Sequence, residues 1–281
     1  MPPLTRLGLL LPAALGAAEP GLVLPGLVDL ALAAETAGFD SLWVPDAAGG
    51  PRSHPRAALE AYTTLGALAV STTTARLGAL ASPVPGRAPS LLAKQVTTVD
   101  ILSGGRAVLG LRAVRRRLTG RRAQLERVDE AAQVCRALFR NEISTFSGRH
   151  FAVDHAANRP APVQVEGPPI LVAGPGGTGL LSVAARRADA VFMEVAPTVL
   201  RRRVVTLAAL SRQAGRDPAE VSVIAALDAP FSGWQSSDRA VLVRRAAALR
   251  QAGADGVVVE APAGTPPEAL ERLGAALGDL A

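Results

Sequence analysis

Short apolar segments alternate with longer segments of helical periodicity along the chain. Most of the short segments are continuous apolar runs, which is typical of parallel strands that are buried on both faces. They span residues 7–11, 41–44, 77–81, 107–111, 170–173, 190–193, 221–227 and 256–259. The spacing between them predicts helices over residues 25–36, 57–71, 90–101, 123–140, 179–187, 198–214, 238–252 and 267–280.

Eight successive strand-and-helix units favour an α/β fold, the (β/α)8 TIM barrel, which typically occupies about 250 residues. A doubly wound parallel sheet has the same alternation of elements, because periodicity does not show whether a sheet closes. We predict one barrel domain over residues 1–281, with the open sheet as the alternative.

One segment interrupts this alternation. ISTFSGRHFAVD, residues 143–154, has two extended runs around Ser147-Gly148-Arg149 and predicts a hairpin. A proline-rich connector, residues 158–169, follows it. We predict that residues 143–169 form an insertion between the fourth and fifth barrel strands.

Composition narrows the class of protein. Hydrophobic residues make up 49 % of the chain and aromatic residues 3 %, so the core must consist mainly of Ala, Val and Leu. The formal net charge is +6 and Lys94 is the only lysine, but the arginines are scattered without interleaved aromatic residues, which argues against nucleic-acid binding. No apolar run approaches the roughly 20 residues of a membrane helix.

Two further features bear on location. MPPLTRLGLLLPAALGAAEP at the start has the features of a secretory signal, but we favour the interpretation of RLGLLLP within it as the first barrel strand. The single cysteine, Cys135, excludes an intrachain disulfide and a multi-cysteine metal site, and its helical spacing predicts a buried thiol. We therefore expect a cytoplasmic protein with neither membrane nor metal as a partner.

In a TIM barrel the chemistry takes place at the carboxyl ends of the strands. The residues at these ends are Pro12, Asp46, Ser82, Arg112, Gly174, Glu194, Asp228 and Glu260. Glu194 and Glu260 are candidate catalytic carboxylates, although helix capping or plain exposure explains them equally well. His54 can reach the barrel mouth from the loop after the second strand or remain solvated, and His150 and His155 beside the hairpin are expected at the surface.

The glycine-rich sequence AGPGGTG, residues 173–179, lies between the fifth strand and its helix. Glycines let the backbone approach an anion closely, and the free N–H groups at a helix start suit a phosphate. The candidate residues are Gly174, Gly176, Gly177 and Thr178. A plain glycine-rich turn is the alternative.

Several longer motifs carry a family resemblance. AETAGFDSLWVPD, RLGALASPVPGRAPSLLAKQVTTVDILSGGRAVLGL, VDEAAQVCRALF, FSGRHFAVD and PPILVAGPGGTGLLSVAARRADAVF occur in this order. Together they resemble the luciferase-like monooxygenase family, which includes bacterial luciferases and F420-dependent oxidoreductases. The resemblance implies a (β/α)8 barrel with a hairpin insertion, and coenzyme F420 or reduced FMN at the C-terminal mouth. It also implies a homodimer that acts on a small-molecule substrate.

The resemblance assigns roles to particular residues. It places the cofactor phosphate in the glycine-rich loop, and the cofactor ring against a bulge or cis peptide at the end of the third strand. Ser82-Pro83 can supply this bent backbone, because X-Pro bonds become cis at the least cost, or it can simply end the strand. Ser82 can also hydrogen-bond the ring, and Asp46 a cofactor hydroxyl.

The chain departs from the family in two places. Many F420-using members have Asp-His where this chain has Asp46-Ala47, so the imidazole suited to proton transfer is missing. After the fourth strand, members continue into a glycine-aromatic segment, whereas here a shorter segment contains Arg112 and residues 115–117, all arginine. Arg112 either pairs with an anionic cofactor or substrate, or closes the ring pocket. Residues 115–117 are either solvated or anion-binding.

Three functions are compatible with these observations. The first is an FMN- or F420-dependent oxidoreductase acting on a small organic substrate. The second is a degenerate family member that serves as a ligand-binding or accessory subunit, which both departures favour. The third is a cofactor-independent barrel enzyme that uses Glu194, Glu260 or Arg112 in acid-base chemistry.

Overall fold

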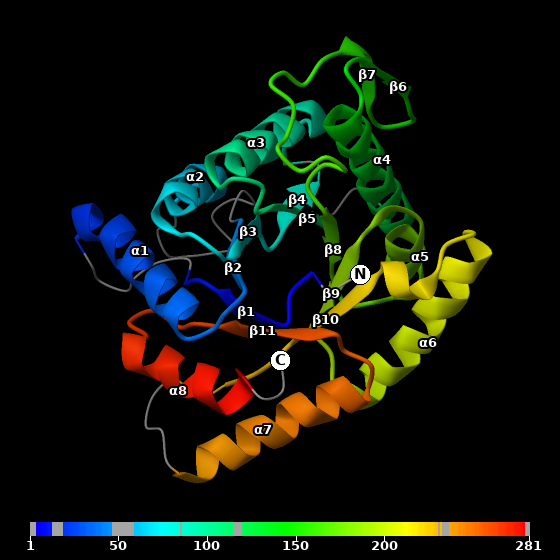
Figure 1. Ribbon diagram of the computed structural model, residues 1–281. Helices are drawn as coiled ribbons and strands as arrows, with labels where there is room; N and C mark the ends of the chain where they lie inside the picture. Colours follow the sequence, from blue (N-terminus) through cyan, green and yellow to red (C-terminus); the bar gives the residue numbers. More distant parts are fainter. Residues whose placement is uncertain are drawn as a thin grey trace.

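The computed structural model describes residues 4–12, 19–46, 59–84, 86–114, 120–229, 231 and 236–278 (Figure 1). Within these residues, parallel strands form a closed barrel at the centre of the molecule. In order around the barrel they are β1 (Leu7–Leu10), β2 (Ser41–Val44), β3 (Arg76–Ala79), β5 (Ala107–Ala113), β8 (Ile170–Ala173), β9 (Ala190–Met193), β10 (Ser222–Ala226) and β11 (Gly256–Glu260). Because β1 pairs with β11 and β3 pairs with β5, the sheet closes. The predicted (β/α)8 barrel is confirmed and the doubly wound sheet is excluded.

Helices surround the barrel (Figure 1). They are α1 (Pro20–Thr36), α2 (Ala61–Ser71), α3 (Pro89–Leu102), α4 (Arg121–Arg140), α5 (Thr178–Arg187), α6 (Pro197–Gln213), α7 (Ser236–Gln251) and α8 (Pro267–Leu277), with a short 3₁₀ helix, η1 (Pro218–Glu220), after α6. None of the helices in the described part of the chain is both long enough and apolar enough to cross a membrane.

The starts of α1 and α2 differ most from their predicted positions. Helix α1 begins five residues early, with Pro20 in its first turn and Pro25 inside the helix. Both prolines are compatible with a helix start, because first-turn N–H groups have no partner within the helix, so the sequence pattern did not distinguish them. Helix α2 begins later than predicted, since the carboxylate of Glu60 accepts the N–H of Thr63 at 2.7 Å and caps the helix there.

The predicted hairpin is confirmed as the antiparallel pair β6 (Ser144–Ser147) and β7 (Ala152–Ala156), which projects beyond α4 (Figure 1). Its turn is fixed to α4, because the carboxylate of Glu130 accepts the backbone N–H groups of residues 149–151 at 2.8 to 2.9 Å. The assignment of residues 1–281 to one domain stays a prediction.

The two histidines beside the hairpin lie in different environments. His155 is exposed, as expected. The surface position expected for His150 is wrong: its side chain is only 9 % exposed, and its Nε2 lies 3.2 Å from Oε2 of Glu126 on α4. The packing of the hairpin against α4, which a local sequence pattern does not indicate, accounts for this burial.

The barrel interior contains a tryptophan, although the chain has few aromatic residues. Trp43 of β2 is fully buried and its indole Nε1 donates to Oγ of Ser41 at 2.9 Å. Glycines on the neighbouring strands leave space for the indole: a Cβ at Gly8 would lie 2.9 Å from the Trp43 Nε1, and one at Gly78 would lie 2.7 Å from Cζ3. The indole therefore packs where strand residues usually place side chains of their own.

The LSGGR motif, residues 102–106, and Asp100 just before it lie at the amino end of β5, opposite the mouth. Arg106 extends its guanidinium to the carbonyl oxygens of Ala69, Thr72 and Ala75 at 2.7 to 2.9 Å. Asp100 is fully buried and accepts the backbone N–H groups of residues 163 and 164. The motif therefore joins the α2–β3 turn, the end of α3 and the connector after the hairpin, which is a structural role.

Cys135 is fully buried in α4, as predicted. Burial raises the pKa of its thiol to about 12, so the thiol is neutral at ordinary pH. It is therefore part of the packed core and not a nucleophile.

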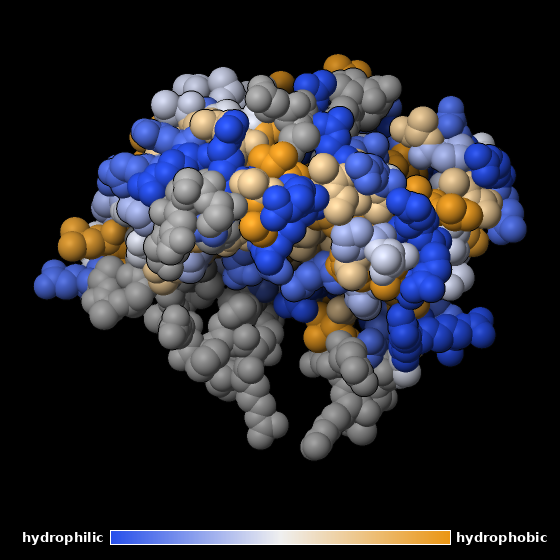
Figure 2. Space-filling model, turned by 90° about the horizontal axis from the view of Figure 1, so that it is seen from below, coloured by the Kyte–Doolittle hydropathy of each residue, from blue (hydrophilic) through white to orange (hydrophobic). Residues whose placement is uncertain are grey.

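On the face that carries α7 and α8, hydrophilic residues are interspersed with smaller hydrophobic patches (Figure 2). Isolated exposed apolar side chains of this kind are normal for a protein surface.

Candidate active site

A buried polar network lies at the mouth, where β2 ends. Asp46 is 4 % exposed, and its Oδ2 accepts from Nη1 of Arg87 at 2.5 Å and from Oγ of Ser82 at 2.8 Å. Arg87 also donates to Oε1 of Glu60 at 2.6 Å, and its guanidinium lies over the ring of Tyr62, 5.2 Å from the centroid. Asp46 therefore has an internal cation as its partner.

The charges in this network stabilise one another. Burial by itself lowers the pKa of Arg87, but the carboxylates of Asp46 and Glu60 outweigh it and the pKa is raised. Burial raises the pKa of Tyr62, so its hydroxyl stays protonated. The hydroxyl of Tyr62 lies 2.9 Å from Oγ of Ser82, which in turn donates to Asp46. The network is a fixed ion pair with a hydrogen-bond chain attached.

The backbone beside Ser82 differs from the predicted bend. The cis peptide bond joins Leu80 to Ala81, whereas Ser82 and Pro83 belong to a short strand, β4 (Ser82–Val84), which pairs with β5. The prediction of the bend at Ser82-Pro83 is therefore wrong by two residues, because the chain turns before β4 and the proline lies within it. Ser82 is buried, with its hydroxyl between Asp46 and Tyr62. Contact of Ser82 with a cofactor ring stays a prediction.

Arg112 lies within β5, which continues two residues beyond the predicted strand end. Its neighbours across the sheet are Pro83 of β4 and Ala173 of β8. Nε of Arg112 donates to the carbonyl oxygen of Ala81 at 2.8 Å. Burial lowers the pKa of the guanidinium, and the charge of Asp46 opposes this effect. Among the described residues its terminal nitrogens have no hydrogen-bond partner.

The glycine-rich loop connects β8 to α5. Gly177 is the N-cap residue of α5 and supplies no side chain to cap the first turn. Gly176 adopts φ 66°, a left-handed conformation that favours glycine, and a Cβ there would lie 2.5 Å from Sδ of Met193. Thr178 is exposed at the first position of α5. The loop thus brings the backbone of Gly174, Gly176, Gly177 and Thr178 and the N-terminus of α5 to the mouth.

Two arginines from distant elements lie beside this loop. A Cβ at Gly177 would collide with Nη2 of Arg121, the first residue of α4. The side chain of Arg203 from α6 lies beside Gly176, and its Nε is buried without a hydrogen-bond partner in the part of the chain that the structure describes. Sequence reasoning missed both residues, because their proximity to the loop depends on how α4, α5 and α6 pack together.

The remaining candidates follow β9, β10 and β11, three consecutive strands of the barrel. Glu260 ends β11 and Glu194 follows β9, and both are exposed. Asp228, after β10, is also exposed. His54 and residues 115–117 lie outside the described residues. Within the described ranges, no group of three or more His, Cys, Asp or Glu side chains is placed to hold a metal ion.

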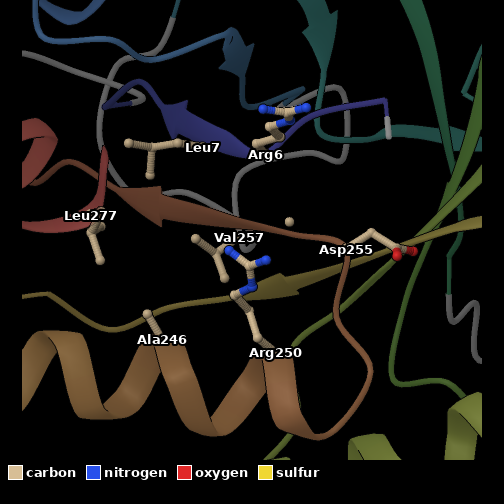
Figure 3. A pocket seen from close by; sticks show the side chains of 8 residues that line it. Arg6, Leu7, Ala246, Arg250, Asp255, Val257 and Leu277 are labelled. Atoms are coloured by element: carbon tan, nitrogen blue, oxygen red, sulfur yellow. The ribbon is translucent and has the colours of Figure 1, made fainter. Parts of the chain in front are cut away.

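Cavities lie at both ends of the barrel. One of about 620 Å³ lies at the mouth, between the ends of β9 and β10 and helix α7. The other, about 20 Å³, lies at the amino ends of the strands, where Figure 3 shows Arg250 of α7 extending toward β11 and Leu277 of α8 nearby. The small cavity has room for about one water molecule. The mouth has space for an organic ligand, and so does a further cavity of about 370 Å³ beside the amino end of β10.

Sequence comparison assigns this barrel to a family. The model of the luciferase-like monooxygenase family matches residues 5–252. The chain belongs to the luciferase-like monooxygenase family. The resemblance inferred from the motifs is confirmed.

Several relatives in this family carry known cofactors. The chain is 31 % identical over 175 residues to the F420-dependent glucose-6-phosphate dehydrogenase of Kineococcus radiotolerans, covering 59 % of this chain and about half, 51 %, of that protein. It is 29 % identical to the 5,10-methylenetetrahydromethanopterin reductase of Methanolobus tindarius, covering 86 % of this chain and 68 % of that one. The structure of an F420-dependent secondary alcohol dehydrogenase in complex with an F420-acetone adduct superposes with a TM-score of 0.84 over 100 % of both chains at 15 % identity, a likeness of fold. Family membership and these relatives support a flavin- or F420-dependent oxidoreductase.

Proposed function

We propose that this protein is an oxidoreductase that binds coenzyme F420, or FMN, at the barrel mouth and transfers a hydride to or from a small organic substrate. The observation that carries the proposal is the glycine-rich loop, where the uncapped start of α5 lies beside the guanidinium of Arg121. A helix N-terminus with a nearby cation suits a phosphate, which both cofactors contain. The similarity to the F420-dependent dehydrogenase of Kineococcus radiotolerans favours F420 over FMN.

The loop has the shape that a phosphate requires. At Gly176 and Gly177 a Cβ would fill the space beside Met193 and Arg121, so glycine keeps the backbone N–H groups accessible. Gly174, Gly176, Gly177 and Thr178 are proposed to hold the phosphate, and Arg121 to supply a matching charge. Once bound, the cofactor supplies the hydride chemistry, and the protein positions it and limits its contact with water.

Arg112 and Asp46 are proposed to form the protein side of the ring site. The terminal nitrogens of Arg112 are available to a carbonyl or an anion, since only its Nε is bonded among the described residues. Asp46 forms an ion pair with Arg87 and accepts from Ser82, and so holds these two side chains in place. Asp46-Ala47 stands where many F420-using members of the family have Asp-His, so proton transfer must rely on other groups.

Glu194 and Glu260 are proposed to supply that proton chemistry. Both carboxylates are exposed at the strand ends, and neither has an ion-pair partner among the described residues. Such a group can accept a proton from a substrate hydroxyl when the hydroxyl lies within hydrogen-bond distance. His54 is a further candidate for this role from outside the described residues.

Cofactor titration tests the proposal. Purified cofactor-free protein is titrated with F420 and with FMN, and binding is followed by the fluorescence of each cofactor. We expect saturable binding of F420, and a loss of at least about tenfold in affinity for Gly176→Ala. Gly215→Ala is the matched control, because Gly215 has a similar φ of 73° but no neighbouring atom within 4 Å of an added Cβ.

Two outcomes would contradict the proposed redox function. If neither cofactor binds the folded wild-type protein, the redox proposal is wrong and a ligand-binding or accessory role replaces it. If substrate is turned over with no cofactor present, a cofactor-independent enzyme replaces it.

The protein is further proposed to act in the cytoplasm as a homodimer. The reduced single cysteine is compatible with that compartment, and the family resemblance suggests the dimer. Light scattering coupled to gel filtration measures the mass in solution, and a monomer at micromolar concentration contradicts the dimer.

A further inference from the structure

The cavity of about 620 Å³ at the mouth separates the ends of β9 and β10 from α7. Its volume falls within the range of ligand sites in proteins, about 300 to 1,000 Å³. Its apolar lining is aliphatic and comes from both walls: Val195 and Pro197, Leu227, and Val241, Ala248 and Leu249. A saturated hydrocarbon chain matches this lining.

The cavity also borders the barrel at the carboxyl end of β10. Side chains alternate along β10, so Ala226 faces inward with Ile224, whereas Ala225 and Leu227 belong to the outer core between the barrel and its helices. Ala226 and Leu227 both line the cavity. A ligand in the cavity therefore reaches from the groove beside α7 to the mouth of the barrel.

The two walls carry opposite charges. Glu194 and Asp228 line the cavity at the strand ends, and Arg244 and Arg245 line it on α7. Arg245 donates to the backbone carbonyl oxygen of Asp228 at 3.3 Å. Arg244 and Glu194 are exposed, and neither has an ion-pair partner among the described residues. The charges left for a ligand are thus a cation on the α7 wall and carboxylates at the mouth.

We propose that this cavity binds an aliphatic hydroxy acid, with its carboxylate on Arg244 and its hydroxyl directed to Glu194 and Asp228 at the mouth. A carboxylate at the mouth end would face two like charges, which fixes the direction of the ligand. A hydroxyl there can donate to a carboxylate. The inference rests on the proposed function only in naming this ligand as the substrate. We name it so because its hydroxyl end lies on the side of the mouth that faces the proposed cofactor site.

Binding to cofactor-free protein tests the site without requiring turnover. Isothermal titration calorimetry compares three probes of equal chain length: ω-hydroxyoctanoate, octanediol and octanedioate. We expect ω-hydroxyoctanoate to bind tightest, by at least about fivefold. Octanediol lacks the carboxylate for Arg244, and octanedioate places a second carboxylate against Glu194 and Asp228.

Two substitutions test the direction of the ligand. Arg244→Gln is expected to reduce the affinity for ω-hydroxyoctanoate to that for octanediol. Glu194→Gln is expected to increase the affinity for octanedioate, because it removes one of the two like charges. Arg250→Gln is the matched control, since Arg250 lies on the same helix but beside the small cavity at the opposite end of the barrel (Figure 3).

Equal affinity for the three probes, no binding of ω-hydroxyoctanoate, or unchanged binding in Arg244→Gln would each overturn the proposal. The outcome is separable from that of the cofactor titration. Binding of the hydroxy acid to a protein that binds neither cofactor supports this site and contradicts the redox function, whereas binding of F420 without the hydroxy acid does the reverse.

Discussion

The guanidinium of Arg87 lies 2.5 Å from the carboxylate of Asp46, and the two side chains are 12 % and 1 % exposed. Removal of one partner from a buried ion pair leaves an uncompensated charge and costs about 3 to 5 kcal/mol. Glu60 and Tyr62 surround the same guanidinium. The stability of this side of the mouth therefore depends on Arg87.

We expect Arg87→Met to lower the free energy of unfolding by about 3 kcal/mol or more, as measured by urea denaturation. Arg122→Met is the control, because the pair of Arg122 with Glu126 is exposed and worth at most about 1 kcal/mol. Equal losses in the two variants would show that the Asp46 pair does not stabilise the mouth.

Arg112 separates two interpretations of the altered mouth. If its terminal nitrogens bind the cofactor, Arg112→Leu should weaken F420 binding by about tenfold or more, measured by fluorescence titration. If the side chain instead closes the ring pocket, the same substitution should tighten binding. Arg6→Leu serves as the control, because Arg6 lies beside the small cavity at the opposite end of the barrel (Figure 3).

The barrel could be predicted because its determinants are local in the sequence. Each apolar run and each helical stretch records which face of an element is buried, and eight such units in succession favour the closed barrel. Strand β4 and the position of the cis bond could not be predicted in the same way. Three residues with a central proline give too short a pattern to identify a strand.

The candidate site was only partly predictable, for a physical reason. Strand ends indicate which residues approach the mouth, and Asp46 and Arg112 lie there. The sequence does not show that Arg87 folds back onto Asp46, or that Arg121 approaches Gly177 from another helix. These contacts join distant segments through long side chains, and the closest signal in the sequence was an unassigned arginine after PVPG. The roles of the candidate residues stay predictions.

The LSGGR motif that identifies the family has a structural position. Arg106 donates to several carbonyl oxygens of the α2–β3 turn, and a lysine offers fewer donors without the planar fork. We expect Arg106→Lys to lower the free energy of unfolding by about 2 kcal/mol, with unchanged F420 affinity in the folded protein. Arg250→Lys should change neither quantity. A loss of affinity without a loss of stability in Arg106→Lys would contradict the structural role.

Glu35 gives the fold a defined dependence on pH. Its carboxylate accepts the N–H groups of Thr73, Thr74 and Ala75 at 2.7 to 3.1 Å and fixes α1 to the turn before β3. Partial burial by itself raises the pKa of Glu35, but these hydrogen bonds outweigh it and the pKa is lowered from 4.5. The unfolded chain therefore takes up the proton first as the pH falls, so the stabilisation by Glu35 is complete above pH 4.5 and is lost as the pH falls through the folded pKa.

We expect Glu35→Gln to lower the free energy of unfolding by about 1 kcal/mol at neutral pH and to reduce the further loss below pH 4.5, as measured by urea denaturation across pH. Glu142→Gln, at an exposed carboxylate, should leave the pH dependence unchanged, and an acid dependence in Glu35→Gln as steep as that of the wild type would contradict this role for Glu35.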